Sequence, residues 1–204
     1  IIKSKLYELL NYIKDIQSNI NGICCVDTSP ISEKVWAQRA GLGWIGKHTT
    51  LITKEFGSWV FLGEIIIDIK LDYDKPFDLD LCGLCRACID ACPTDALVEE
   101  YQLDAKKCIS YQTIENREKI PSKFSDKMDN WVYGCDICQE VCPWNHRSSI
   151  LTNEASFKPR EFLIQKDINY LYSLSDKQYS NLFKNSAMKR TKLKGLKRNI
   201  DFIR

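Results

Sequence analysis

Eight cysteines between residues 82 and 142 constrain this sequence more than any other feature. They are Cys82, Cys85, Cys88, Cys92, Cys108, Cys135, Cys138 and Cys142. The first four follow the spacing C-x2-C-x2-C-x3-C and are followed by a proline, as is the last cysteine. In this spacing three thiolates hold one 4Fe–4S cluster and the fourth reaches across to another. The sequence therefore predicts two 4Fe–4S clusters.

The crossing rule predicts which thiolates share a cluster. One cluster is expected on Cys82, Cys85, Cys88 and Cys142, and the other on Cys92, Cys108, Cys135 and Cys138. Clusters with interleaved ligands lie close together, so electrons can pass between them. We expect a bacterial ferredoxin-like two-cluster domain over residues 79–147.

Paired cysteines also bind structural zinc, or form disulfides in secreted domains. Zinc sites need neither the four-cysteine run nor the prolines that follow it. Disulfides fit poorly with a 204-residue chain in which we find no signal-peptide pattern. Iron–sulfur clusters remain the prediction, and a cytoplasmic protein is expected because such thiolates stay reduced inside the cell.

The composition is typical of a globular chain, with 44% hydrophobic and 27% charged residues. The longest apolar run, Val60 to Ile69, is interrupted by Gly63, Glu64 and Asp68. No membrane-spanning segment is therefore expected.

Residues 1–78 are expected to form part of an α/β domain. Leucines and isoleucines at helical spacing predict a first helix over residues 6–16. Its apolar face needs a partner, so we expect an upstream piece to be missing.

Residues 23–26 are typical of a short buried strand that ends at Asp27, and ligands collect at strand ends in α/β sheets. A second helix is expected from a cap at Ser29 to near residue 41.

Gly41 to His48 fits two phosphate-binding motifs only in part. The glycines match G-x-G-x-x-G, and Lys47 nearly completes a P-loop. Both motifs need a strand before the glycines and a helix after them, whereas here a helix is expected first and a β-prone segment follows. We expect the glycines to let backbone approach a bulky ligand. Residues 49–53 and 59–70 are then expected to form a hairpin.

Positive charge is concentrated at the end of the chain. Residues 184–204 hold eight basic side chains against Asp201 alone, a local charge of +7, whereas the whole chain carries +2. The rest is therefore acidic, at −5. Such a basic end suggests contact with a polyanion, although a charge run is often only a solvated helix face. We expect residues 148–204 to be a helical, basic tail.

Three stretches together resemble one enzyme family. They are V-D-T-S-P-I-S-E-K-V-W-A-Q-R-A-G-L-G-W-I-G-K-H-T from Val26, C-I-S-Y-Q-T-I-E from Cys108 and Y-G-C-D-I-C-Q-E-V-C-P-W-N from Tyr133. With the eight cysteines, they resemble epoxyqueuosine reductase over nearly the whole chain. The family has a further upstream part, so the resemblance implies a fragment that lacks the N-terminal part of its cobalamin-binding domain.

The resemblance implies a function. The family uses two 4Fe–4S clusters and cobalamin to reduce epoxyqueuosine to queuosine in the anticodon loop of a tRNA, the last step of queuosine biosynthesis. The expected fold is α+β, with a partial α/β cobalamin-binding domain, a ferredoxin-like two-cluster domain and a C-terminal helical segment. Expected partners are a tRNA with a GUN anticodon and an external low-potential electron donor, and a monomer is expected.

The resemblance also implies site residues. Asp27 occupies the family's catalytic aspartate position, and we expect it to donate a proton. A carboxyl group is protonated near neutral pH only where its charged form is disfavoured, so we expect Asp27 to be buried. The alternative is that Asp27 only caps a turn. Cobalamin contacts are expected from Gly46, Lys47, His48, Thr49, Ser110, Tyr111, Asp136 and Ile137, and tRNA contacts from Lys189, Arg190, Lys194 and Lys197.

His48 and His146 are the only histidines. The resemblance implies that cobalamin is held without a histidine ligand.

Two alternative functions share some of the features described above. A two-cluster ferredoxin-type electron-transfer module would need no cobalamin. A dehalogenase-like cobalamin enzyme acting on a small molecule would need no basic tail.

Overall fold

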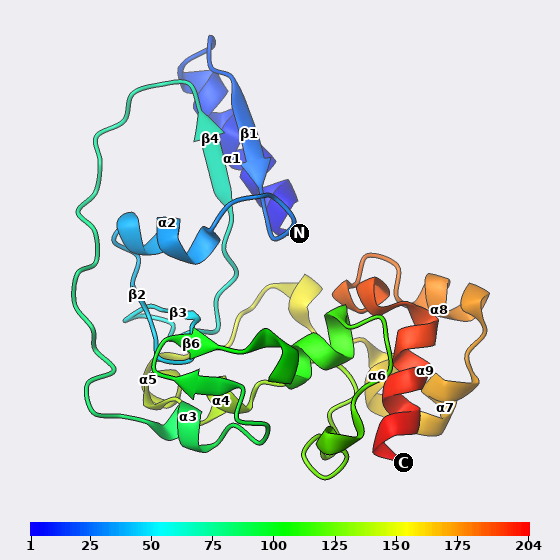
Figure 1. The fold of residues 1–204 in the computed structure, drawn as a ribbon. Coiled ribbons are helices and arrows are strands. Elements are labelled where there is room, and N and C mark those ends of the chain that lie inside the picture. Colours follow the sequence, from blue (N-terminus) through cyan, green and yellow to red (C-terminus); the bar gives the residue numbers. More distant parts are fainter.

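The computed structural model describes residues 1–204 and has three parts (Figure 1). The N-terminal part, blue to cyan, stands above a green middle part that carries the cysteines, and the orange and red C-terminal part lies beside the middle one. The predicted mixture of helices and strands is confirmed. None of the helices combines the length and apolarity needed to cross a membrane.

In the N-terminal part, one helix lies against a two-stranded antiparallel sheet. The elements are α1 (Ile2–Ile16), β1 (Gly22–Cys25) and β4 (Glu64–Ile67). Leu10 is buried against Gly22, where a Cβ would lie 2.5 Å from its Cδ1 atom. The predicted first helix is confirmed, but its face is covered only in part, because Leu9 and Ile16 are exposed.

The predicted hairpin of residues 49–53 and 59–70 is wrong in its pairing. β3 (Leu51–Ile52) pairs with β2 (Trp44–Ile45), and β4 pairs with β1. The chain reverses earlier than predicted, at Thr49, which has a left-handed φ of 67°. Gly43 permits the close approach of β2 and β3, because a Cβ there would lie 2.0 Å from the Ile52 carbonyl oxygen.

The predicted helix start at Ser29 is also wrong. α2 spans Glu33–Arg39, and it begins after an irregular loop. Asp27 precedes this loop with a left-handed φ of 51°, and its backbone N–H donates to Glu33 Oε1 at 2.6 Å. The Glu33 carboxylate thus stabilises the loop, which bends instead of continuing as helix. The end of α2 near Gly41 is as predicted, and φ at this glycine is 77°.

The middle part consists of short elements joined by turns. They are α3 (Ala87–Asp90), β5 (Leu97–Glu99), β6 (Gln102–Leu103), α4 (Ile137–Glu140), α5 (Pro143–Ser148), a π-helical turn (Tyr111–Glu115) and two 3-10 turns (Ala105–Lys107 and Ser122–Phe124). Ile109, Ile120, Phe124 and Met128 form a small core.

The C-terminal part is helical, as predicted. Its elements are 3-10 segments at Ala155–Phe157 and Ala187–Thr191 and the helices α6 (Glu161–Gln165), α7 (Ile168–Ser173), α8 (Asp176–Leu182) and α9 (Lys192–Ile203). Asp167 caps α7 by accepting from the Tyr170 N–H, which separates α6 from α7. The core contains Leu174, Tyr179, Phe183, Leu193, Leu196 and Ile200.

Two residues of α9 join the C-terminal part to the middle part. Asn199 is fully buried and donates to the carbonyl oxygens of Thr113 and Val132, both at 2.8 Å. Arg198 donates to the carbonyl oxygens of Gln112 (2.8 Å), Asn116 and Glu118 (both 2.6 Å). Part of the basic run therefore serves the fold, because these donors satisfy carbonyl groups around the π-helical turn.

We expect Asn199→Ala to destabilise the protein by about 2–4 kcal/mol, because two buried carbonyl groups lose their donors. The midpoint of urea unfolding, followed anaerobically, measures the loss. Lys194→Ala removes an exposed side chain of the same helix and should change stability by no more than about 0.5 kcal/mol. Equal midpoints for both variants would contradict this account of the junction.

Candidate functional site

Two small cavities divide the eight cysteines into two sets of four. Cys82, Cys85, Cys88 and Cys142 line a cavity of about 160 Å³, which we call the first cysteine cavity. Cys92, Cys108, Cys135 and Cys138 line one of about 190 Å³, the second cysteine cavity. Each cavity thus gathers the cysteines that the spacing groups together.

The arrangement of the thiols fits clusters better than single ions. A tetrahedral zinc site brings four sulfur atoms to about 3.8 Å from one another. No group of three or more His, Cys, Asp or Glu side chains lies close enough to hold one ion, and all ten cysteines are free thiols. The thiols surround cavities instead of meeting at a point, as binding to the four iron corners of an iron–sulfur cube requires.

The protein surroundings make these thiols poor acids. Burial raises the pKa of Cys88 and of Cys135 to about 11 each, and that of Cys138 to about 12. Nearby cysteines raise these pKa values further, because neighbouring thiolates repel one another. Positively charged iron is what would stabilise such a group of thiolates, and its binding would release their protons.

The glycine-rich segment lies against the first cysteine cavity. The Trp44 indole N–H donates to Cys82 Sγ at 3.4 Å. Lys47, only 3% exposed, donates from Nζ to the Gly83 carbonyl oxygen at 2.6 Å and pairs with Glu100 at 2.8 Å. The hydrogen bond that Lys47 donates to Glu100 raises the pKa of Lys47. A buried positive charge is therefore held beside the loop between the first two cysteines.

His48 lies between the two cysteine cavities and lines both. It is 3% exposed, and its Nδ1 is 2.5 Å from the Thr50 hydroxyl oxygen. Burial, together with the positive charge of Lys34, lowers the pKa of His48 to about 4. The imidazole is thus neutral at physiological pH. His146, in contrast, is exposed on α5.

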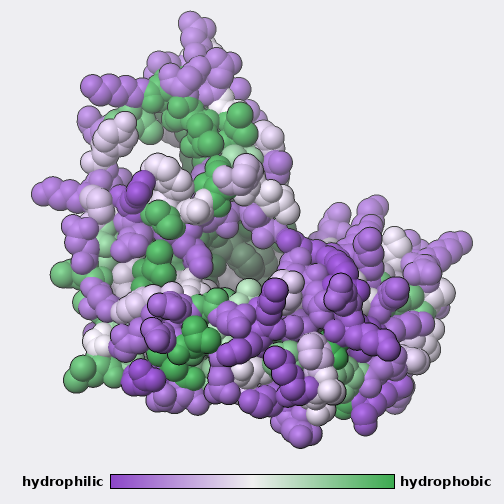
Figure 2. All heavy atoms as spheres, viewed as in Figure 1, coloured by the Kyte–Doolittle hydropathy of each residue, from purple (hydrophilic) through white to green (hydrophobic).

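A much larger cavity, of about 920 Å³, lies where the three parts of the chain meet. Figure 2 shows the hollow, with hydrophobic atoms in its floor. Its apolar lining residues include Val26, Leu51, Val60, Phe61 and Leu62. Thr50 and Gln139 line both this cavity and the second cysteine cavity. The second cysteine cavity is therefore next to the large cavity.

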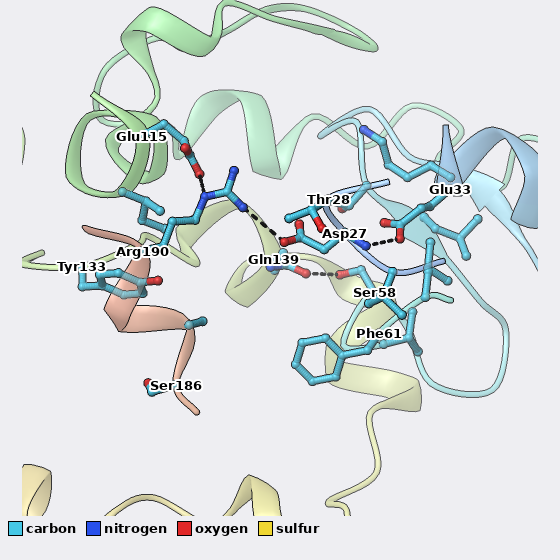
Figure 3. Close-up of a pocket in the computed structure, with 18 residues that line it drawn as sticks. Asp27, Thr28, Glu33, Ser58, Phe61, Glu115, Tyr133, Gln139, Ser186 and Arg190 are labelled. Carbon is cyan, nitrogen blue, oxygen red and sulfur yellow. Dashed lines mark hydrogen bonds and ion pairs between the residues drawn. The ribbon is translucent and has the colours of Figure 1, made fainter. Parts of the chain in front are cut away.

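Asp27 lies at the rim of the large cavity, opposite Arg190 (Figure 3). Arg190 Nη1 is 3.1 Å from Asp27 Oδ2, and Arg190 Nε is 2.7 Å from Glu115 Oε1. The expected burial of Asp27 is not found, because its side chain faces the open cavity and is 71% exposed. The three residues come from the three parts of the chain.

The residues expected to contact cobalamin fall into two groups. Lys47 and His48 line the first cysteine cavity, and Gly46 is packed against Ile52 and His48. Lining the second cysteine cavity are His48, Thr49, Ser110, Asp136 and Ile137. Tyr111 is half-buried in the π-helical turn. The large cavity is lined by none of these residues.

Sequence reasoning missed several residues of the large cavity. Thr50 follows a segment that was singled out, and Glu115 ends a stretch that carries the family resemblance. Gln139 lies in another such stretch, whereas Ser58, to which it is joined by a 2.9 Å hydrogen bond, carried no signal. They meet only because the chain brings residues 81 positions apart together.

The four basic residues expected to contact tRNA have different surroundings. Lys189 and Lys194 are exposed. Lys197 Nζ lies 5.5 Å from the ring centre of Tyr172, and Arg190 points into the large cavity. Of these four residues, only Lys189 and Lys194 therefore have no described partner inside the protein.

Comparison with known proteins identifies the family. Residues 81–145 match the family described as a 4Fe-4S double cluster binding domain. The chain is 47% identical to the epoxyqueuosine reductase of Cellulophaga algicola over all of its own length and 66% of that protein. It is 43% identical to that of Synechocystis sp., over 98% of this chain and 69% of the relative. The chain belongs to the epoxyqueuosine reductase family.

Solved structures agree with this assignment. The epoxyqueuosine reductase of Bacillus subtilis, with its aspartate-bearing catalytic loop swung out of the active site, superposes with a TM-score of 0.90 at 32% identity. An epoxyqueuosine reductase with an epoxyqueuosine-modified tRNA stem loop gives 0.89 at 33% identity. Both matches cover 98% of this chain, and 52% and 54% of those chains. The chain thus spans about two thirds of its curated relatives and about half of the solved ones.

If the first cysteine cavity holds a cluster, we expect Lys47→Met to make its reduction potential more negative. Removing a buried positive charge disfavours the reduced cluster, which carries one more negative charge. Redox titration followed by electron paramagnetic resonance measures the shift, which should affect one cluster only. Lys70→Met, which removes an exposed charge beyond β4, serves as the control, and an equal shift in both variants would contradict the assignment.

Proposed function

We propose that this chain carries the two cluster sites, the proton donor and part of the cobalamin cavity of an enzyme that reduces epoxyqueuosine to queuosine in a tRNA anticodon loop. The two-cluster domain would span residues 79–147, between a partial cobalamin-binding domain and the helical tail. One observation carries the proposal: the large cavity has Asp27 at its rim and the second cysteine cavity at its side.

The cluster ligands are proposed from the two cysteine cavities. Cys82, Cys85, Cys88 and Cys142 would hold one 4Fe–4S cluster, and Cys92, Cys108, Cys135 and Cys138 the other. The second set lies beside the large cavity, and His48 lies between the sets. In space, the second set of cysteines therefore lies between the first set and the large cavity. This is the order in which electrons would pass from cluster to cluster and on to the cavity.

The size and lining of the large cavity support a role as part of the binding site of a large organic cofactor. Its volume of about 920 Å³ is near the upper end of the range of about 300–1,000 Å³ for ligand sites. Apolar side chains line one side, and Ser58, Gln139 and Thr50 offer hydrogen bonds. When bound, cobalamin would supply a strongly reducing cobalt centre, and the clusters would supply electrons.

The reaction needs a proton donor from the protein. Converting an epoxide to an alkene and water consumes two electrons and two protons, and the departing oxygen must be protonated. Asp27 is one of three carboxylates that line the cavity. A ligand that fills the cavity would exclude water from Asp27, which would disfavour its charged form against the effect of the Arg190 ion pair. The catalytic loop of the Bacillus subtilis relative also carries an aspartate, which supports this role. A purely electron-carrying module would have no use for such a cavity.

The tRNA would bind near the tail. A relative has been solved with an epoxyqueuosine-modified tRNA stem loop. The exposed Lys189 lies on the 3-10 segment that carries Arg190 to the cavity, and the exposed Lys194 lies on α9, which follows it. We propose that these lysines contact phosphates while the modified base, unstacked from the loop, enters the large cavity.

Asp27→Asn should abolish most of the activity while leaving the cofactors in place. Loss of a general acid typically costs about 10²–10⁴-fold in rate. The measurement is conversion of epoxyqueuosine-containing tRNA to queuosine by the reconstituted holoenzyme that contains this chain, with cluster and cobalamin spectra as the control. Wild-type holoenzyme that is fully loaded and reduced but forms no queuosine would disprove the proposed function.

The double variant Lys189→Ala, Lys194→Ala should weaken tRNA binding, most strongly at low salt. Each lost phosphate contact should make the slope of log affinity against log salt shallower by about 1. Fluorescence anisotropy with a labelled stem loop gives the slope. Lys3→Ala with Lys14→Ala removes the same charge from α1, and an identical effect there would rule out a specific tail contact.

A further inference from the structure

The loop that presents Asp27 has few anchors of its own. Residues 28–32 form no helix or strand, and only Ser32 is tied to α2, through its carbonyl. The backbone hydrogen bonds of residues 28–31 are the short turns from Thr28 N–H to the Val26 carbonyl (2.6 Å) and from Ile31 N–H to the Ser29 carbonyl (2.7 Å). The Asp27 carboxylate is largely exposed. Loops with so few contacts open at low free-energy cost.

Two contacts hold the loop to the rest of the molecule at Asp27. The first is local, from its backbone N–H to the Glu33 carboxylate. The second is the ion pair between its carboxylate and Arg190, 163 residues further along the chain. Only the second contact fixes where the carboxylate points.

Arg190 is itself held in place. Its Nε bonds the Glu115 carboxylate at 2.7 Å while its Nη1 bonds Asp27. Glu115 belongs to the π-helical turn, whose carbonyl groups are bound by Arg198 and Asn199 of α9. Figure 3 shows the guanidinium lying between the two carboxylates. The planar fork of an arginine can bond two carboxylates at once, which the single ammonium of a lysine does less well.

From this geometry we propose that Arg190 is a positioning residue: it latches the Asp27 loop over the large cavity, and Glu115 orients the latch. The loop is then closed only when the tail is docked on the two-cluster domain, because Arg190 comes from the tail and Glu115 from that domain. The part of the proposal that concerns turnover rests on the proposed function. The part that concerns the loop does not.

A phosphate contact is the competing role for Arg190. Its side chain is 45% exposed, yet both carboxylates near it already use its donors, and one bond is as short as 2.7 Å. An arginine that waits for phosphate would be expected on an open surface, as Lys189 is. Binding to RNA and positioning of Asp27 make different predictions, so one set of variants separates them.

Hydrogen exchange tests the latch without substrate, at the backbone amides of Thr28, Ser29, Ile31 and Ser32, since Pro30 has no N–H. In the holoenzyme we expect Arg190→Met to speed their exchange about two- to five-fold, the range for loss of a partly exposed ion pair. Arg190→Lys should give an intermediate rate. Lys189→Met removes a neighbouring charge from the same 3-10 segment and should leave the exchange unchanged.

A double-mutant cycle shows whether Arg190 acts through Asp27. Asp27→Asn is the suitable partner, because asparagine tolerates the left-handed backbone conformation and removes only the charge. We expect the exchange rate of Asp27→Asn to match that of Arg190→Met, with no further increase in the double variant. Additive effects, or unchanged exchange in Arg190→Met, would overturn the latch.

Turnover of the tRNA stem loop provides the second readout. For Arg190→Met we expect kcat to fall between about five-fold and about 100-fold, with the Kd for the stem loop changed less than about two-fold. A weaker Kd with normal kcat would overturn the latch in favour of a phosphate contact. If the wild-type holoenzyme forms no queuosine, the proposed function fails, and the exchange experiment still decides whether the latch exists.

Discussion

Interleaving of the cysteines between two cavities is the constraint on which the rest of the structure depends. Cys142 returns to the first cysteine cavity after the chain has built the second, and Cys92 leaves the first run for the second. Residues 82 to 142 therefore fold as one unit, although their helices and strands are only a few residues long. The other two parts pack on that unit. The glycine-rich segment lies against the first cavity, and α9 binds the carbonyl groups around the π-helical turn.

The same unit determines how the large cavity is built. Gln139 directly follows Cys138, the last cysteine of the second set, and accepts a hydrogen bond from the Ser58 hydroxyl of the N-terminal part. Asn145, which follows the last cysteine, accepts from the Ser58 N–H at 2.6 Å. The segment that carries the cysteines therefore also holds Ser58, which is part of the wall of the large cavity. A change that loosens the cysteine segment should be felt at the Asp27 rim, because the wall of the cavity and the walls of the cysteine sites share residues.

Charge is used differently in the two parts that carry it. In the tail, a run of basic residues looked like a single polyanion surface, yet its members divide among separate tasks. Arg198 satisfies backbone carbonyl groups, Arg190 pairs with two carboxylates, and Lys189 remains exposed. Near the first cysteine cavity, a single buried lysine, Lys47, pairs with an exposed carboxylate, Glu100. A charge count along the sequence cannot separate these cases, since burial and partners decide what each charge does.

The sequence by itself determined the family, the number of cysteine sites and the grouping of their thiols, because cysteine spacing is a local geometric requirement that any fold must respect. It also determined the amphipathic first helix, through the period of its leucines. Tertiary structure alone decided that β4 pairs with β1, that the glycine-rich segment faces the cysteines instead of the large cavity, and that Asp27 meets Arg190. These contacts join residues far apart in the chain. They depend on the reversal of the backbone at Thr49, on the close approach of two strands at Gly43 and on burial of side chains, none of which a local pattern encodes.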